Sequence, residues 1–297
     1  AVAADAPKAG APLNGSTLGG KYERRGVMSD TLFSMRSRPS LLVCVLFSLY
    51  SIGWTAVANS QGDSPSIDRR VLDLISHARM NPRQFDAVKN QVVSMGADAV
   101  EPLSKVLKDS RQEAILRHLA AVSLWEIKDP KAVSPLIHAL NDPDDQVAGT
   151  AAFALGDFGD LRAVRPLISA FESKCGTQEG AAWAFSKLKP PDAIGPMIKY
   201  LTQGCVVGPV GAVEFRTLVA VGAALGDIGQ PALKPLLAVL PDLKRESLAM
   251  AARALGDIGD SRAIESVRGL LDNADQTVRK EAKEALDKLT KNQQHSR

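Results

Sequence analysis

Aromatic residues make up only 5% of this 297-residue chain, although 45% of it is hydrophobic. A core built from this chain must therefore consist mainly of Ala, Leu and Val, whose small side chains favour closely packed helices. The sequence also lacks an excess of charge. Of the 36 basic and 33 acidic residues, six and three lie within residues 1–58, which leaves 30 of each afterwards. We expect no nucleic-acid partner, because that class of protein usually carries a positive field.

Long hydrophobic runs are also scarce, and the one that stands out lies near the start. Residues 28–58 combine Arg36 and Arg38, an apolar run over 41–54 and the small residues Ala56-Val57-Ala58. This order is typical of a secretory signal peptide, so we predict cleavage after Ala58 and a secreted or periplasmic protein. The alternative is an uncleaved anchor, but the run is shorter than the roughly 20 residues that a spanning helix needs. We therefore expect no stable membrane anchor after cleavage.

Residues 1–27 precede the first methionine, Met28, and are rich in Ala, Gly and Pro. We expect them to be disordered or to be read-through of upstream DNA, with translation beginning at Met28. Residues 59–65 are predicted to form a linker to the segment that follows.

Internal repetition is the main signal in the rest of the chain. Residues 151–160, AAFALGDFGD, recur as residues 251–260, AARALGDIGD, and a shorter copy occupies 223–229. Each copy is followed by an apolar segment with a proline at one fixed place, which Ser266 takes in the last unit. The prolines are Pro102, Pro135, Pro166, Pro196 and Pro235. A period near 30 residues corresponds to one helical hairpin.

The unit from Asp129 onwards predicts the anatomy of the hairpin. Asp129 precedes Pro130 and can cap a first helix. The turn over 141–144 then leads into a second helix, for which we predict an end at Leu155 and a stop at Gly156. A helical wheel places Val147, Ala151, Ala154 and Leu155 on one face, which we expect to form the core between repeats.

These strings resemble the HEAT-like repeats of the phycobilin lyase type. The resemblance implies an all-α fold, an α-solenoid of about five to six stacked HEAT-like hairpins over residues 66–290. Ile67–Met80 and 82–94 would form its N-terminal cap and 277–289 its C-terminal cap, with a disordered tail over 291–297. Deoxyhypusine hydroxylase shares the repeats and carries His-Glu pairs as iron ligands. This sequence has no His-Glu dipeptide, so we do not expect that identity.

The sequence offers no strong catalytic pattern. Its four histidines, at positions 77, 118, 138 and 295, have no partner at a metal-ligand spacing, and nucleophile signatures are absent. We therefore expect no metal, no cofactor and no enzymatic activity. Asp157, Asp227 and Asp257 recur at equivalent places; they are interpreted as bonded to backbone amides of the turns, with cation binding as the alternative.

Cys175 and Cys205 are the cysteines that remain after cleavage, in equivalent loops of successive repeats. An even pair is a candidate disulfide in an oxidising compartment, although neighbouring helices lie about 8–10 Å apart and a bridge needs Cα atoms within about 7 Å. We therefore leave open whether Cys175 and Cys205 are bridged or are free thiols. The segment 204–211 belongs to a lengthened unit and is either part of a binding face or a neutral expansion.

The second helices carry a row of residues opposite their buried face. By resemblance to HEAT solenoids this row lies on the concave side, where a protein or peptide partner would bind. The alternative is that its rings only pack over the Ala-rich core. The candidate contact residues are Val122, Phe153, Trp183 and Arg253 of this row and His118 and Glu179 of the neighbouring row.

The function predicted from these observations is that of an exported, non-catalytic protein-binding scaffold. Two alternatives are a bilin lyase or isomerase, which the repeats resemble by family name, and a structural module of an envelope assembly.

Overall fold

The computed structural model describes residues 66–80, 84–205 and 215–295. All of them belong to one compact unit, residues 63–297. These residues form α-helices and short 3₁₀ turns, with no strand among them. The predicted all-α solenoid is therefore confirmed, whereas the predicted signal peptide over 28–58 and the linker over 59–65 lie outside the described residues.

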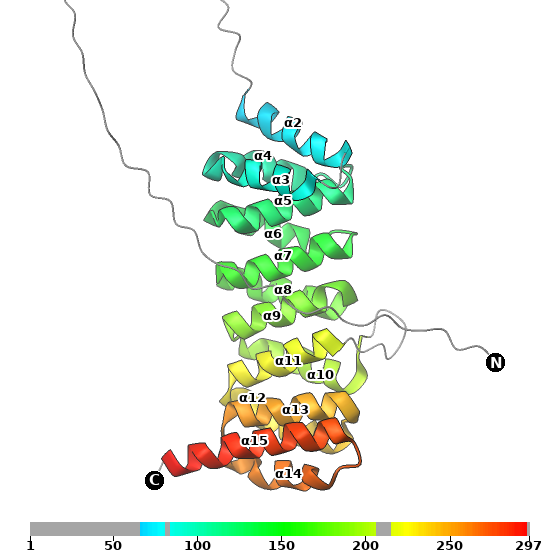
Figure 1. Cartoon of the computed structure of the whole chain (residues 1–297), viewed down its shortest axis with the longest axis vertical. Coiled ribbons are helices and arrows are strands. Elements are labelled where there is room, and N and C mark those ends of the chain that lie inside the picture. The colour runs from blue at the N-terminus through cyan, green and yellow to red at the C-terminus, as the bar shows by residue number, and fades with distance from the viewer. Residues whose placement is uncertain (1–65, 81–83, 206–214, 296–297) are drawn as a thin grey trace, which may run out of the picture. The chain divides into compact units, whose positions relative to one another are not determined.

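The described helices form consecutive antiparallel pairs. Their bounds are α2 Ile67–Met80, α3 Phe85–Val93, α4 Val100–Lys108, α5 Ala114–Ile127, α6 Val133–Ala139, α7 Asp145–Phe158, α8 Val164–Ser173, α9 Gln178–Leu188, α10 Ile194–Gln203, α11 Phe215–Ile228, α12 Gln230–Val239, α13 Arg245–Ile258, α14 Ile264–Arg268 and α15 Gln276–His295. The pair α2/α3 precedes six hairpins, from α4/α5 to α14/α15. Within the unit the pairs are stacked in chain order (Figure 1).

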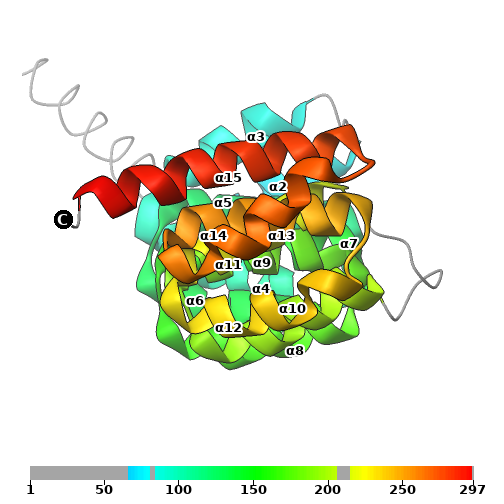
Figure 2. The same ribbon diagram turned by 90° about the horizontal axis from the view of Figure 1, so that it is seen from below.

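The hairpins make two layers. The second helices α5, α7, α9, α11, α13 and α15 each pack on the next, while the first helices form the other layer. A view along the stack places α8, α10 and α12 on one side and α13 and α15 on the other (Figure 2). None of the described helices is both long and apolar enough to cross a membrane.

The core between the layers consists of small and branched aliphatic side chains, as the composition predicts. Val147, Ala151, Ala154 and Leu155 are all fully buried, so the face taken from the helical wheel is correct. Burial of such side chains, at about 25 cal/mol per Å² of apolar surface, is the main term that stabilises the stack.

The first helices start as the sequence predicts. The carboxylates of Asp129, Asp160 and Asp260 accept hydrogen bonds from the backbone N–H groups of Lys131, Arg162 and Arg262 at 2.8, 2.8 and 2.9 Å. Each aspartate thus caps a short 3₁₀ turn that leads into the first helix. The fixed proline lies within the following turn, as Pro135 does in α6.

The predicted end of the second helix is wrong by one turn. Helix α7 continues to Phe158 and stops at Gly159, whose φ of 70° is left-handed. Gly156 instead lies inside the helix, where an added Cβ would be 2.7 Å from the Cα atom of Ala184 in α9. Gly156 therefore allows close approach of two second helices, and the second glycine of the Gly-Asp-x-Gly string ends the helix.

The predicted tail also differs from the structure. Helix α15 runs to His295, five residues into the segment 291–297 that we expected to be disordered. The sequence Lys291-Asn292-Gln293-Gln294 contains neither Gly nor Pro, so nothing in it stops the helix.

Candidate functional site

The residues predicted to contact a partner lie on the layer of second helices. Val122 of α5 and Phe153 of α7 are half-buried, Trp183 of α9 is 39% exposed, and Arg253 of α13 is exposed. Trp183 is thus more exposed than most tryptophans, which are highly buried on average.

Three rings on successive second helices lie side by side. The Phe153 centroid is 6.5 Å from that of Trp183, at an interplanar angle of 52°, and 6.4 Å from that of Trp125, at 11°. We call Trp125, Phe153 and Trp183 the aromatic row. Trp125 is absent from the residues predicted by sequence, although it lies only one turn after Val122 on the same face of α5.

Polar groups fix both ends of the aromatic row. The indole N–H of Trp125 donates to a carboxylate oxygen of Asp157 at 3.0 Å. At the other end the Lys187 ammonium group lies 4.3 Å from the centroid of the Trp183 ring. Among the described residues, the Trp183 indole N–H has no acceptor, so it is available to donate to a bound molecule.

Two of the predicted contact residues already have partners within the chain. His118 stacks on Phe85 of α3, with centroids 5.6 Å apart, and its Nε2 atom lies 3.1 Å from Thr150 Oγ1. Burial lowers the pKa of His118 below its usual value, although Asp144 opposes this. Glu179 forms an ion pair with Arg216 at 2.7 Å. These two residues border the aromatic row rather than extend it.

The interpretation of Asp157, Asp227 and Asp257 as caps of backbone amides is wrong. Their carboxylates accept hydrogen bonds from side chains of neighbouring second helices, because the aspartates lie in the last turn of α7, α11 and α13 and not in the loop that follows. The donors are Trp125, Ser186 and, at 2.6 Å, Lys288. These bonds connect α5 to α7, α9 to α11 and α13 to α15.

Cys175 and Cys205 form a disulfide in the structure, with Cα atoms 5.8 Å apart. Cys175 opens the turn between α8 and α9, and Cys205 follows α10. The spacing is shorter than the distance between packed helix axes because the bridge joins two turns. Most of the lengthened segment, residues 206–214, lies outside the described residues.

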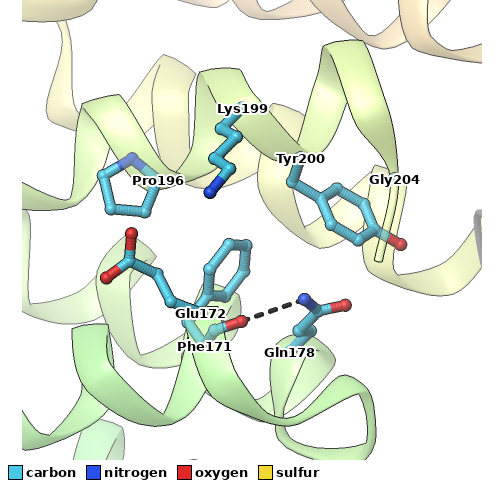
Figure 3. A pocket seen from close by; sticks show the side chains of 7 residues that line it. All are labelled: Phe171, Glu172, Gln178, Pro196, Lys199, Tyr200 and Gly204. Carbon is cyan, nitrogen blue, oxygen red and sulfur yellow. Dashed lines mark hydrogen bonds between the residues drawn. The ribbon is translucent and has the colours of Figure 1, made fainter. Parts of the chain in front are cut away.

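A small cleft of about 20 Å³ lies between α8 and α10, in the layer of first helices. Its floor is formed by Phe171 and Tyr200, whose rings pack edge to face at 5.8 Å. Figure 3 shows the hydrogen bond of 2.9 Å from Gln178 to the Phe171 carbonyl that closes one side. The cleft therefore lies in the layer opposite the aromatic row.

No group of three His, Cys, Asp or Glu side chains that could hold a metal ion occurs within residues 66–80, 84–205 and 215–295. These residues thus offer no donor set that fits the iron centre implied by the resemblance to deoxyhypusine hydroxylase.

A family profile described as HEAT repeats matches residues 100–186, 133–205 and 215–292. The chain therefore belongs to the HEAT-repeat family. Among curated proteins it is 31% identical over 175 residues to phycocyanobilin lyase subunit alpha of Picosynechococcus, which covers 56% of this chain and 55% of the relative. It is also 30% identical over 121 residues to deoxyhypusine hydroxylase of Aspergillus clavatus, covering 39% of this chain and 36% of the relative. The chain thus spans about half and about a third of their lengths.

Two solved structures also match the chain, each with a TM-score below 0.5. Human deoxyhypusine hydroxylase in complex with glycerol has a TM-score of 0.37 at 21% identity and covers 74% of this chain and 84% of its own. The CpcE–CpcF complex of phycocyanin lyase from Nostoc has a TM-score of 0.40 at 21% identity and covers 88% of this chain and 99% of its own.

The prediction that the chain has no enzymatic activity is contradicted by the curated relatives. The phycocyanobilin lyase subunit and the deoxyhypusine hydroxylases carry the names of enzymes. Catalytic groups that are contributed by several repeats need not lie at a fixed spacing in the sequence, so the absence of known spacings does not exclude activity.

Proposed function

We propose that this HEAT-repeat protein binds a protein or peptide partner through the face of its second helices, with the aromatic row as the anchor. The observation that carries the proposal is Trp183. Its ring is 39% exposed, and it lies between the Phe153 ring and the Lys187 ammonium group. Exposed aromatic side chains with a polar edge are the residues that most often dominate the energy of an interface.

Export is part of the proposal. The sequence of residues 28–58 supports it, and so does the Cys175–Cys205 bridge, because disulfides persist mainly in oxidising compartments. The form to test is therefore the protein recovered from the envelope of an exporting host. N-terminal sequencing of that form is expected to begin at Asn59.

Trp183→Ala is expected to weaken partner binding at least about 30-fold, because truncation of such an anchor typically removes 2 kcal/mol or more. The exported protein is immobilised, partners are captured from envelope extract, and the affinity of each captured species is measured with the wild type and the variant.

Leu161→Ala is the matched control for Trp183→Ala. Leu161 is 70% exposed, but it lies in the turn between α7 and α8, outside the second-helix face. Binding should survive this change. If Trp183→Ala lowers the free energy of unfolding strongly and leaves binding intact, the ring only packs over the core and the proposal is wrong.

A second candidate function is the handling of a bilin, favoured by the 31% identity to a phycocyanobilin lyase subunit. The aromatic row offers flat apolar surface, and Lys187 offers a cation for a carboxylate. Titration of the protein with phycocyanobilin, followed by absorbance, tests this candidate. A spectral shift that Trp183→Ala abolishes would favour it over a protein partner, and an unchanged spectrum would exclude it.

A further inference from the structure

The turns that lead from first to second helices are tied together along one edge of the stack. Between α6 and α7, Asp142 binds the Arg117 side chain of α5. The Lys174 ammonium group, in the turn between α8 and α9, donates to the backbone carbonyl of Asp142. Arg117, Asp142 and Lys174 thus connect three successive hairpins.

The disulfide carries this series of ties to the fourth hairpin. Cys175 follows Lys174 directly, and its bridge to Cys205 reaches the end of α10. Among the described residues, no hydrogen bond or ion pair joins the turn 174–177 to Gly204 or Cys205. The bridge is therefore what links the turn 174–177 to the end of α10. Cys205 is buried, with 4% of its surface exposed.

The bridge also lies next to the helix that carries Trp183. Helix α9 begins at Gln178, three residues after Cys175, and no side chain caps its N-terminus. Its start is held by the Thr177 hydroxyl, which donates to the Ala170 carbonyl at 2.8 Å, and by Gln178. An uncapped first turn leaves N–H groups without intrahelical partners, so its order depends on the turn before it.

We propose that the Cys175–Cys205 bridge is a redox-controlled tie that fixes the first turn of α9, so that the second-helix face is fully ordered only in the oxidised protein. Reduction by a dithiol breaks the S–S bond. It delivers two electrons and two protons to the two sulfur atoms, which become thiols, while the dithiol becomes a disulfide. The proposal rests on the proposed function in so far as Trp183 is a contact residue, since it describes the regulation of that face.

Amide hydrogen exchange of the full chain, with and without dithiothreitol, tests the proposal without any partner. Reduction is expected to speed exchange roughly tenfold or more in peptides that cover residues 174–183. Peptides from α2–α3 and from α13–α15 should change little, because the contacts that run from the bridge through Lys174 and Asp142 to Arg117 do not include them. The outcome therefore does not depend on whether the proposed function is correct.

The double variant Cys175→Ala/Cys205→Ala is the control, with Ala chosen because a serine hydroxyl at position 205 would be buried. It should show the fast exchange without reductant and no response to dithiothreitol. The proposal is overturned by two free thiols in the non-reduced protein, by unchanged exchange in residues 174–183, or by an equal increase in every described helix. In the last case the bridge would act on global stability alone.

Discussion

Asp142→Ala is expected to lower the free energy of unfolding by about 3–5 kcal/mol, the usual effect of removing one partner of a buried ion pair. The side chains of Arg117 and Asp142 are each 5% exposed, and two hydrogen bonds of 2.7 and 2.8 Å join them. Without the carboxylate, the guanidinium charge stays buried, with the Gln112 carbonyl as its remaining acceptor. Urea unfolding followed by circular dichroism measures the loss.

Glu265→Ala is the control for an exposed pair. Glu265 binds Arg268 with side chains that are 82% and 56% exposed, and loss of such a pair changes stability by about 0–1 kcal/mol. The double variant Arg117→Met/Asp142→Asn removes the buried charge on both sides, while Asn keeps an acceptor for the Asp144 N–H. It should recover most of the stability. A double variant no more stable than Asp142→Ala would show that shape, and not charge, makes this site important.

The same pair predicts a dependence on pH. Burial alone would raise the pKa of Asp142, but the hydrogen bonds from Arg117 and from the Asp144 amide hold it below its usual value. Because the folded-state pKa lies below that of the unfolded chain, the stabilisation is present above pH of about 4 and is lost as the pH falls through the folded-state pKa. The difference in stability between wild type and Asp142→Asn should therefore shrink in acid.

The sequence predicted the fold because the solenoid is encoded locally. The period, the proline of each first helix and the capping aspartates such as Asp129 and Asp160 all act within one hairpin. What it missed depends on contacts between hairpins. Local periodicity does not specify how the repeats stack. The stacking places Gly156 against Ala184, and it brings Asp157 and Asp227 to the side chains of the preceding second helix.

The candidate site was predictable only in part for the same reason. A helical wheel placed Phe153 and Trp183 on the open face, but a wheel treats one helix at a time. It gave no reason to select Trp125, whose ring enters the row because Phe153 of the next hairpin stacks on it. It also could not show that His118 and Glu179 have partners on other second helices, Thr150 and Arg216.

Gly156→Ala and Gly256→Ala are each expected to destabilise the protein by about 1–3 kcal/mol, the usual cost of forcing an extra methyl group into a packed core. An added Cβ would lie 2.7 Å from the Cα atom of Ala184 at Gly156 and 2.6 Å from that of Ala285 at Gly256. Both distances involve backbone atoms, so one second helix must move away from its neighbour. The two sites lie in different hairpins, and the losses should add to about 2–6 kcal/mol in the double variant.

Gly195→Ala separates this steric cost from helix propensity. Gly195 lies in α10, and an added Cβ there meets no atom within 4 Å. The same substitution should therefore stabilise the protein, by up to about 1 kcal/mol, since Ala favours helix over Gly by that amount. Opposite signs at positions 156 and 195 in urea unfolding would show that the repeated glycine is kept for the spacing of the second helices. If both substitutions changed the stability in the same direction, the close contact between Gly156 and Ala184 would be contradicted. The alignment of the helices that carry the aromatic row would then be contradicted as well.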